Sequence, residues 1–243
     1  MRLALVYARI QVLELLRFPG FSIATLGFPT LLFALFGLPR AHDEPNVLVA
    51  SYAAFAVLGV GFYQFGVSAA MERTTPWAAA FLRTLPASPS TRLAGRVLAA
   101  LTFAVAATSA LFVFAVLTTP VSLGAGRWIA LCATLLVGSI PFVALGVGIA
   151  YWTTPKTALP VANVLYLVLA YLGALWTGPR DLPAGVRTIS TYTPTRQWAN
   201  ALWGAIAGDP LRPTPWLVLA AYLIVFALVA TVGYRRDEGQ RFR

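Results

Sequence analysis

The chain has 243 residues, of which 59% are hydrophobic and only 11% are charged, against roughly 45–50% and about 25% in an ordinary soluble domain. This excess excludes a simple soluble globule, and the long apolar runs without acidic residues indicate a polytopic membrane protein. The net charge of +10 does not indicate nucleic acid binding, because the basic residues flank the apolar runs, where topology and anionic lipid explain them.

The chain begins with a basic, helix-prone segment, residues 1–20. This segment either lies on the inner membrane surface as an interfacial helix or extends the first span. Six runs are long and apolar enough to cross a bilayer: residues 21–38, 47–71, 93–118, 128–152, 158–177 and 215–234. We therefore expect an all-α integral membrane protein with a single transmembrane domain over residues 1–243.

The basic residues orient these six spans. Six spans place both termini on one side of the membrane, and with the termini inside the inner segments hold 12 Lys and Arg residues and the outer segments hold 6. Basic residues concentrate on the cytoplasmic side of membrane proteins. We therefore expect both termini to be cytoplasmic.

The cytoplasmic segment between the second and third spans predicts a short helix. Thr75 can cap it, Pro76 suits its first position, and Pro86 stops it. One apolar face recurs every four residues, at Trp77, Phe81 and Leu85. Spacing alone leaves two possibilities open: this face packs on the protein's own spans or in the headgroups, or it docks on a partner.

The outer segment 178–214 predicts a further helix. Thr195 can cap it and Gly208 can end it. Its apolar face comprises Trp198, Leu202, Ala205 and Ile206. A helix that dips into the outer leaflet and an amphipathic surface helix both fit this composition.

The residues inside the spans argue against several kinds of chemistry. From the third span onward the span interiors hold no Asp, Glu, Lys or His, and Arg96 lies only a turn into the third, so we do not expect ion-coupled transport. The only lysine, Lys156, follows Pro155, so the chain has no P-loop. One histidine, His42, and one cysteine, Cys132, are too few for a structural metal or haem site. A transporter with this sequence must take its energy from elsewhere.

The segment Met71-Glu-Arg-Thr-Thr-Pro-Trp-Ala-Ala-Ala-Phe-Leu-Arg-Thr-Leu-Pro-Ala-Ser-Pro resembles the signature of type-2 ABC transporter permeases. In that family an acidic-basic pair follows the second span, and a short helix then leads to the third. The outer stretch Ile189-Ser-Thr-Tyr-Thr-Pro-Thr-Arg-Gln-Trp is similar to the family's approach to a partly buried outer helix. The chain departs from the family in one respect, because Thr74-Thr75-Pro76 replaces a longer charged run with a glycine.

The resemblance implies the permease subunit of an ATP-driven exporter in the bacterial plasma membrane. Such permeases dimerise, with an identical or a sister protomer, and bind separate ATPase subunits, which hold the ATP and magnesium; no cofactor, metal or catalytic residue is expected in this chain. Pro76–Leu85 would be the coupling helix. The implied ATPase-coupling residues are Glu72, Arg73, Trp77, Phe81 and Arg83. The implied translocation path includes Tyr63, Gln64 and Asn163.

An uncharged, aromatic-lined interior suits a lipophilic cargo such as a drug, another small molecule or a lipid, which corresponds to multidrug efflux. The sequence leaves two alternatives open. The first is a membrane scaffold or assembly factor that transports nothing. The second is a lipid-modifying enzyme, for which the candidate polar residues are Arg180, Asp181, Arg187 and Arg196.

Overall fold

A computed structural model describes residues 2–17, 19–74, 89–178 and 181–241. Within these ranges the chain forms helices joined by turns, and no strand occurs. The elements in chain order are α1 (Arg2–Leu16), α2 (Pro19–Leu32), the π-helix η1 (Phe33–Gly37), the 3₁₀-helix η2 (Leu38–Arg40), α3 (Pro45–Val60), the π-helix η3 (Gly61–Ser68), α4 (Ala69–Thr74), α6 (Pro89–Thr118), α7 (Ala125–Trp152), α8 (Pro155–Leu172), α9 (Ala184–Ser190), α10 (Pro194–Ala207) and α11 (Pro213–Arg241).

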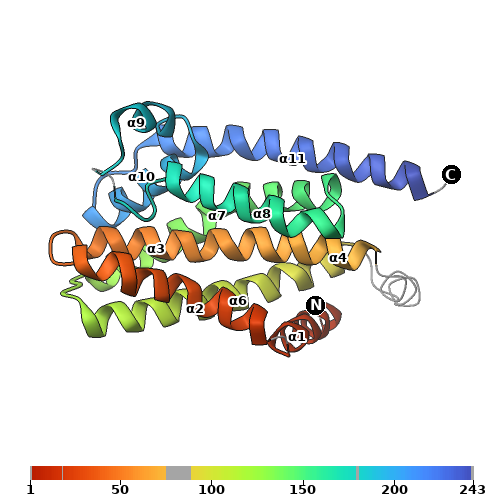
Figure 1. Ribbon diagram of the computed structural model, residues 1–243, viewed down its shortest axis with the longest axis horizontal. Coiled ribbons are helices and arrows are strands. Elements are labelled where there is room, and N and C mark those ends of the chain that lie inside the picture. The colour runs from red at the N-terminus through yellow and green to blue at the C-terminus, as the bar shows by residue number, and fades with distance from the viewer. Residues whose placement is uncertain (1, 18, 75–88, 179–180, 242–243) are drawn as a thin grey trace.

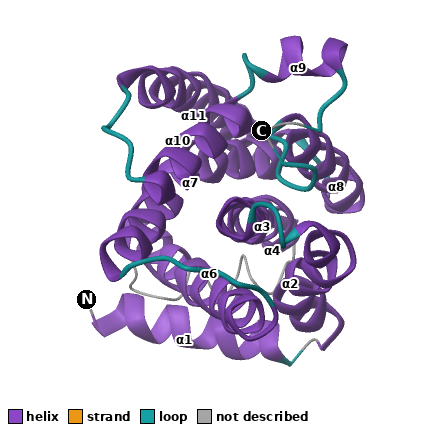
Figure 2. Ribbon diagram, turned by 90° about the vertical axis from the view of Figure 1, so that its left-hand side faces the viewer, coloured by secondary structure: helices purple, strands orange, loops and turns teal. Residues whose placement is uncertain are grey.

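The predicted second span forms the centre of the molecule. It is the continuous helical path of α3, η3 and α4, and Figure 2 shows it between α2, α6, α7 and α8. In the helix Pro45–Arg73, 83% of the most apolar 18-residue window is buried, against 17% in Pro213–Asp237. Small side chains let other helices approach closely in a membrane, and Ala, Ser and Gly recur along α3. Its composition therefore suits a position at the core.

Five helices of the described residues are long and apolar enough to cross a membrane: Pro45–Arg73, Leu93–Thr118, Ala125–Trp152, Pro155–Leu172 and Pro213–Asp237. They correspond to the second to sixth predicted spans. The first predicted span, 21–38, is helical through α2, η1 and η2, but its apolar helix Leu26–Arg40 is shorter. The all-helical membrane architecture is thus confirmed. That residues 21–38 also cross the membrane, which would make six spans, stays a prediction.

The fifth span is shorter than predicted. Helix α8 ends at Leu172, five residues before the expected end at Thr177, and Ala174 then adopts a positive φ of 57°. A Cβ atom at Gly173 would lie 2.8 Å from Cβ of Thr195, at the start of α10. After Leu172, Ala174 and Leu175 are fully buried and Trp176 is partly buried, because α10 packs against this turn.

Different helices form the two ends of the bundle. Figure 1 shows α1, the end of α4 and the C-terminal end of α11 together at one end, and α9 and α10 at the other. Both ends of the described chain therefore lie at one end of the bundle. That this end faces the cytoplasm, with both termini on one side of the membrane, stays a prediction from the basic residues.

Helix α1 is separate from the first predicted span. Arg17 forms a turn after α1, and Figure 2 shows α1 lying across the bundle beside α6. The two helices touch closely at Gly95, where a Cβ atom would lie 2.6 Å from Cδ1 of Tyr7 and 3.0 Å from the carbonyl oxygen of Ala4. Small residues permit this backbone approach between helices in membranes.

Glycines also bring η3 and α7 into backbone contact. A Cβ atom at Gly146 of α7 would lie 2.7 Å from the carbonyl oxygen of Gly61, and one at Gly66 would lie 3.4 Å from the carbonyl oxygen of Gly146. The structure uses these glycines for close packing, at the level where the second span is π-helical.

Helix α10 begins two residues earlier than predicted. The hydroxyl of Thr193, not Thr195, accepts from the amide of Arg196 at 3.4 Å and caps the helix. Thr195 instead donates to the carbonyl oxygen of Leu169 at 2.6 Å, which ties α10 to α8. Gly208 ends the helix with a φ of 79°, as predicted.

Most of the predicted apolar face of α10 is buried. Trp198, Leu202 and Ile206 are covered, whereas Ala205 is partly exposed. The indole of Trp198 lies over Gly138 of α7 and donates to the carbonyl oxygen of Thr134 at 3.1 Å. Helix α10 is therefore part of the packed bundle.

Candidate functional site

The last turn of α4 carries the acidic-basic pair that the sequence singled out. The carboxylate of Glu72 accepts from the side-chain amide of Gln11 in α1, Nε2 to Oε1 at 3.1 Å. Its other oxygen forms an ion pair with the guanidinium of Arg96 in α6. The Arg96 side chain is 15% exposed and that of Glu72 is 32% exposed. One carboxylate therefore joins α4 to both α1 and α6.

Arg73 points toward the other half of the bundle. Its Nη1 lies 2.6 Å from Oδ1 of Asp237 in α11, and its Nη2 donates to the carbonyl oxygen of Thr153 at the end of α7, at 3.0 Å. The guanidinium also lies 5.3 Å from the ring centroid of Tyr151. The exposed fractions of the Arg73 and Asp237 side chains are 14% and 21%. Arg73 therefore joins α4 to α7 and α11.

The energetics of these contacts make the junction stiff. A hydrogen bond to a charged group contributes about 1.5–3 kcal/mol, and removing one member of a largely buried pair leaves an uncompensated charge, which costs more than the contact itself. Glu72 and Arg73 are neighbours on one turn and have separate partners. The end of the second span is thus fixed to four other helices at once.

Three of the partners were not predicted from the sequence: Gln11, Arg96 and Asp237. For Arg96 a signal was present, because a cation one turn into an apolar span needs a partner. For Gln11 and Asp237 the sequence offers no comparable signal. They lie 61 and 164 residues from their partners, Glu72 and Arg73.

The remaining predicted coupling residues, Trp77, Phe81 and Arg83, lie outside the described residues, as does the predicted coupling helix 76–85. The described chain stops at Thr74, the last residue of α4, and resumes at Pro89, the first of α6. The Glu72–Arg73 pair therefore directly precedes the segment in which these residues occur.

Two of the three predicted path residues lie together. The hydroxyl of Tyr63, in η3, donates to Oδ1 of Asn163, in α8, at 2.5 Å. Both side chains are partly exposed. This contact joins the second and fifth spans, the two helices that the resemblance implied for the path.

Gln64 lies apart from this contact. Its side chain is 1% exposed, and its amide nitrogen has no hydrogen-bond partner among the described residues. It is therefore buried inside the protomer and does not join the Tyr63–Asn163 contact.

Aromatic rings surround the Tyr63–Asn163 contact. The ring of Tyr166 stacks on that of Phe55 with centroids 4.5 Å apart and meets the ring of Tyr63 edge-on at 6.0 Å. Tyr166 also donates to the carbonyl oxygen of Phe55 at 3.1 Å. A Cβ atom at Gly59 would lie 3.1 Å from that hydroxyl. The interface of the second and fifth spans is thus aromatic and closely packed.

The outer loop holds the residues that a lipid-modifying enzyme would need, of which Arg180 lies outside the described ranges. Asp181 lies 4.0 Å from Arg40, and Arg187 donates to a backbone carbonyl of the loop at 3.1 Å. The guanidinium of Arg196 lies 4.8 Å from the ring centroid of Trp203, and burial lowers its pKa from the ordinary value. These contacts stabilise the loop and give no support to a catalytic cluster.

In the parts of the chain that the structure covers, no group of three or more His, Cys, Asp and Glu side chains could hold a metal ion. A charged junction at one end of the central helix and a polar contact near its middle are both built on the same helical path, α3–η3–α4.

Comparison with known proteins agrees with this architecture. The sequence model of the ABC-2 type transporter family matches residues 3–206. YvfS of Bacillus subtilis (strain 168), which is named as a transport permease, is 27% identical over 188 residues, covering 77% of this chain and 76% of that protein. The chain therefore belongs to the ABC-2 type transporter family and is a multi-pass membrane permease of the bacterial plasma membrane.

Proposed function

We propose that this permease is the membrane-spanning subunit of an ATP-driven exporter. It acts as a dimer, its cytoplasmic face binds separate ATPase subunits, and its cargo is a lipophilic small molecule, drug or lipid. Permeases of this family generally work with an ABC ATPase. The observation that carries the proposal is the position of the Glu72–Arg73 pair, which fixes the end of the central helix to four other helices directly before segment 75–88.

This position gives the pair a mechanical role. When an ATPase displaces the predicted coupling helix 76–85, the force reaches α4, which directly precedes segment 75–88. Glu72 passes it to α1 and α6, and Arg73 passes it to α7 and α11, because each contact is a charged hydrogen bond with little exposure to water. The helices then move together as the ATP-bound ATPase pair closes.

Docking on the ATPase needs different residues. A short helix binds a groove through spaced apolar anchors, and Trp77 and Phe81 lie four residues apart. Arg83 adds a charge at the edge of that contact. These three residues bind the ATPase, whereas Glu72 and Arg73 act inside the permease.

The cargo path lies between the two protomers and is lined by the second and fifth spans. Tyr63 and Asn163 provide one polar contact in an otherwise apolar and aromatic surrounding. Gln64 is buried, so it packs behind the residues that line the path and does not face the cargo. A lipophilic cargo suits this surface, because few polar groups of the protein would lose their contact with water when the cargo covers them.

Purification of the tagged chain from its native membrane in a gentle detergent tests the proposal. We expect a P-loop ATPase in equal ratio, and we expect the double substitution of Trp77 and Phe81 by Ala to remove it. Recovery of the chain without an ATPase, in a detergent that preserves such complexes, would favour the scaffold function instead.

A second experiment separates docking from coupling. Glu72→Gln and Arg73→Gln should leave the ATPase bound and abolish cargo-stimulated ATP hydrolysis in reconstituted vesicles. Arg212→Gln, at the opposite end of the bundle, is the matched control and should keep wild-type stimulation. If Arg73→Gln also keeps it, the pair has only a structural role.

A further inference from the structure

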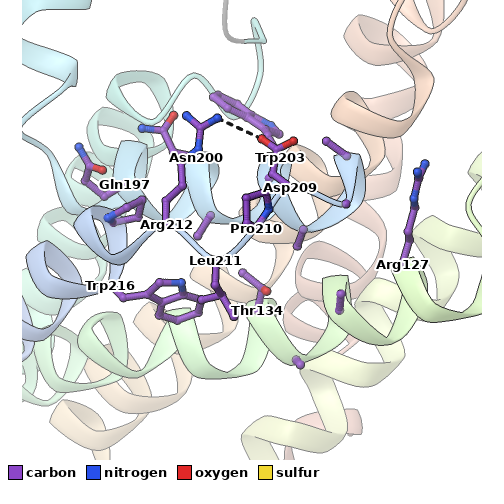
Figure 3. A pocket seen from close by; sticks show the side chains of 18 of the residues that line it. Arg127, Thr134, Gln197, Asn200, Trp203, Asp209, Pro210, Leu211, Arg212 and Trp216 are labelled. Atoms are coloured by element: carbon purple, nitrogen blue, oxygen red, sulfur yellow. Dashed lines mark hydrogen bonds and ion pairs between the residues drawn. The ribbon is translucent and has the colours of Figure 1, made fainter.

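A cavity of about 1200 Å³ lies at the end of the bundle opposite the termini. Figure 3 shows its lining side chains, which come from α7, α10, the start of α11 and the loop between them. It is distinct from the Tyr63–Asn163 contact, because neither of those residues lines it. Nothing in the proposed export mechanism uses it.

One wall of the cavity is a stripe along α7. Arg127, Ala130, Ala133 and Val137 line it at helical spacing. At 1.5 Å per residue the stripe is about 15 Å long, which is about half the thickness of a bilayer's hydrocarbon core. Ala133 and Val137 are exposed. The wall therefore leads from the end of the span toward the middle of the membrane.

An arginine, Arg127, lies at the mouth of the cavity. Arg127 is exposed and, within the described part of the chain, has no carboxylate within 4.0 Å. Its guanidinium lies at the C-terminal end of α10, since a Cβ atom at Gly208 would be 3.6 Å from Nη2. Both carboxylates that line the cavity have partners: Asp209 lies 3.3 Å from Arg212, and Glu44 has another contact.

Two tryptophans of the cavity indicate its position along the membrane normal. Trp203 of α10 and Trp216 of α11 line the cavity, and Figure 3 shows Trp216 at the end away from Arg127. Tryptophan side chains gather at the level of the lipid headgroups. The cavity thus combines a cation at headgroup level with an apolar wall that enters one leaflet.

We propose that this cavity binds one phospholipid of the leaflet at this end, with the phosphate at Arg127 and an acyl chain along the α7 stripe. Arginine suits a phosphate because its guanidinium donates two parallel hydrogen bonds. A small soluble anion would use the mouth and leave the apolar wall unfilled. This proposal requires only that the chain lies in a membrane. It can therefore be tested independently of ATP-driven export.

Native mass spectrometry of the full-length chain in detergent, with phosphatidylglycerol added, measures this binding. We expect one tightly retained lipid in the wild type and about a tenfold weaker affinity in Arg127→Gln, which corresponds to the loss of one charged hydrogen bond. Arg40→Gln is the matched control, since Arg40 lies at the same end and does not line the cavity. Equal retention by Arg127→Gln and the wild type would overturn the proposal.

Two further arms test the apolar wall and the source of the phosphate. Ala133→Trp should fill the wall and remove the lipid, whereas Leu136→Trp, on an exposed face of the same helix outside the cavity, should retain it. Glycerol 3-phosphate, which has the phosphate without a chain, should not displace the lipid. Displacement by glycerol 3-phosphate would show that the site takes a small anion. Full retention of the lipid by Ala133→Trp would show that no acyl chain lies along the α7 stripe, and either result would overturn the proposal.

Discussion

The contact between Arg73 and Asp237 can be measured by a double-mutant cycle on the stability of the chain. The substitutions are Arg73→Gln, Asp237→Asn and both together. The Nη1–Oδ1 distance is 2.6 Å and the side chains are only 14% and 21% exposed. A hydrogen bond between charged groups at such a site contributes about 1.5–3 kcal/mol. We therefore expect a coupling energy of about 2 kcal/mol, or a factor of about 30 in the unfolding equilibrium.

The single variants should differ from each other. Arg73→Gln should cost about 3 kcal/mol, because it leaves the carboxylate of Asp237 unpaired and also weakens the bond to the carbonyl oxygen of Thr153. Asp237→Asn should cost about 2 kcal/mol, because the amide still accepts a hydrogen bond from the guanidinium. Unfolding in mixed micelles with increasing SDS, followed by tryptophan fluorescence, gives these values.

The control pair is Arg212 and Asp209 at the other end of the bundle. Its atoms are 3.3 Å apart and its side chains are 76% and 42% exposed. An exposed pair contributes about 0.2–1 kcal/mol, so the cycle of Arg212→Gln and Asp209→Asn should give a coupling energy below about 0.5 kcal/mol. If both cycles give the same coupling energy, the burial argument for the junction is wrong.

Three other predictions concern the packing of the bundle. Gly146→Ala should destabilise the chain by about 1–3 kcal/mol, because the new Cβ atom meets a backbone carbonyl oxygen at 2.7 Å. Gly126→Ala, on the same helix with open space around it, should leave the SDS midpoint unchanged. If the two variants have the same midpoint, the close contact at Gly146 is wrong. Trp198→Ala should cost about 3–5 kcal/mol in the same assay, since it removes a fully buried indole, and a loss below about 1 kcal/mol would show that α10 is not docked. A cycle of Tyr63→Phe and Asn163→Ala should give a coupling energy of about 0.6 kcal/mol, typical of hydrogen bonds between membrane helices, and a value of zero would show that the two spans do not share this bond.

Local patterns in the sequence predicted much of the helical structure. The apolar runs indicated the membrane helices because a bilayer demands long stretches without charge. Gly208 indicated the end of α10 because glycine adopts positive φ without a steric cost. These features depend on residues that are close together in the sequence, so the sequence alone is enough to predict them.

Other local predictions failed where tertiary contacts intervened. Thr195 has the right chemistry for a helix cap, yet its hydroxyl donates to Leu169 of α8, and Thr193 caps the helix. The stretch after Leu172 is apolar enough to continue a span, yet it turns and is buried under α10. In both cases a contact with a distant helix replaced the local preference.

By itself, the sequence determined that this is a helical membrane protein, and its resemblance to a known family drew attention to Glu72 and Arg73 after the second span. Only the tertiary structure decided their partners, Gln11, Arg96 and Asp237, and paired Tyr63 with Asn163. The reason is physical: a charge in an apolar surrounding must find a partner, but many residues could serve, and packing of helices far apart in the chain selects which one comes within hydrogen-bonding distance.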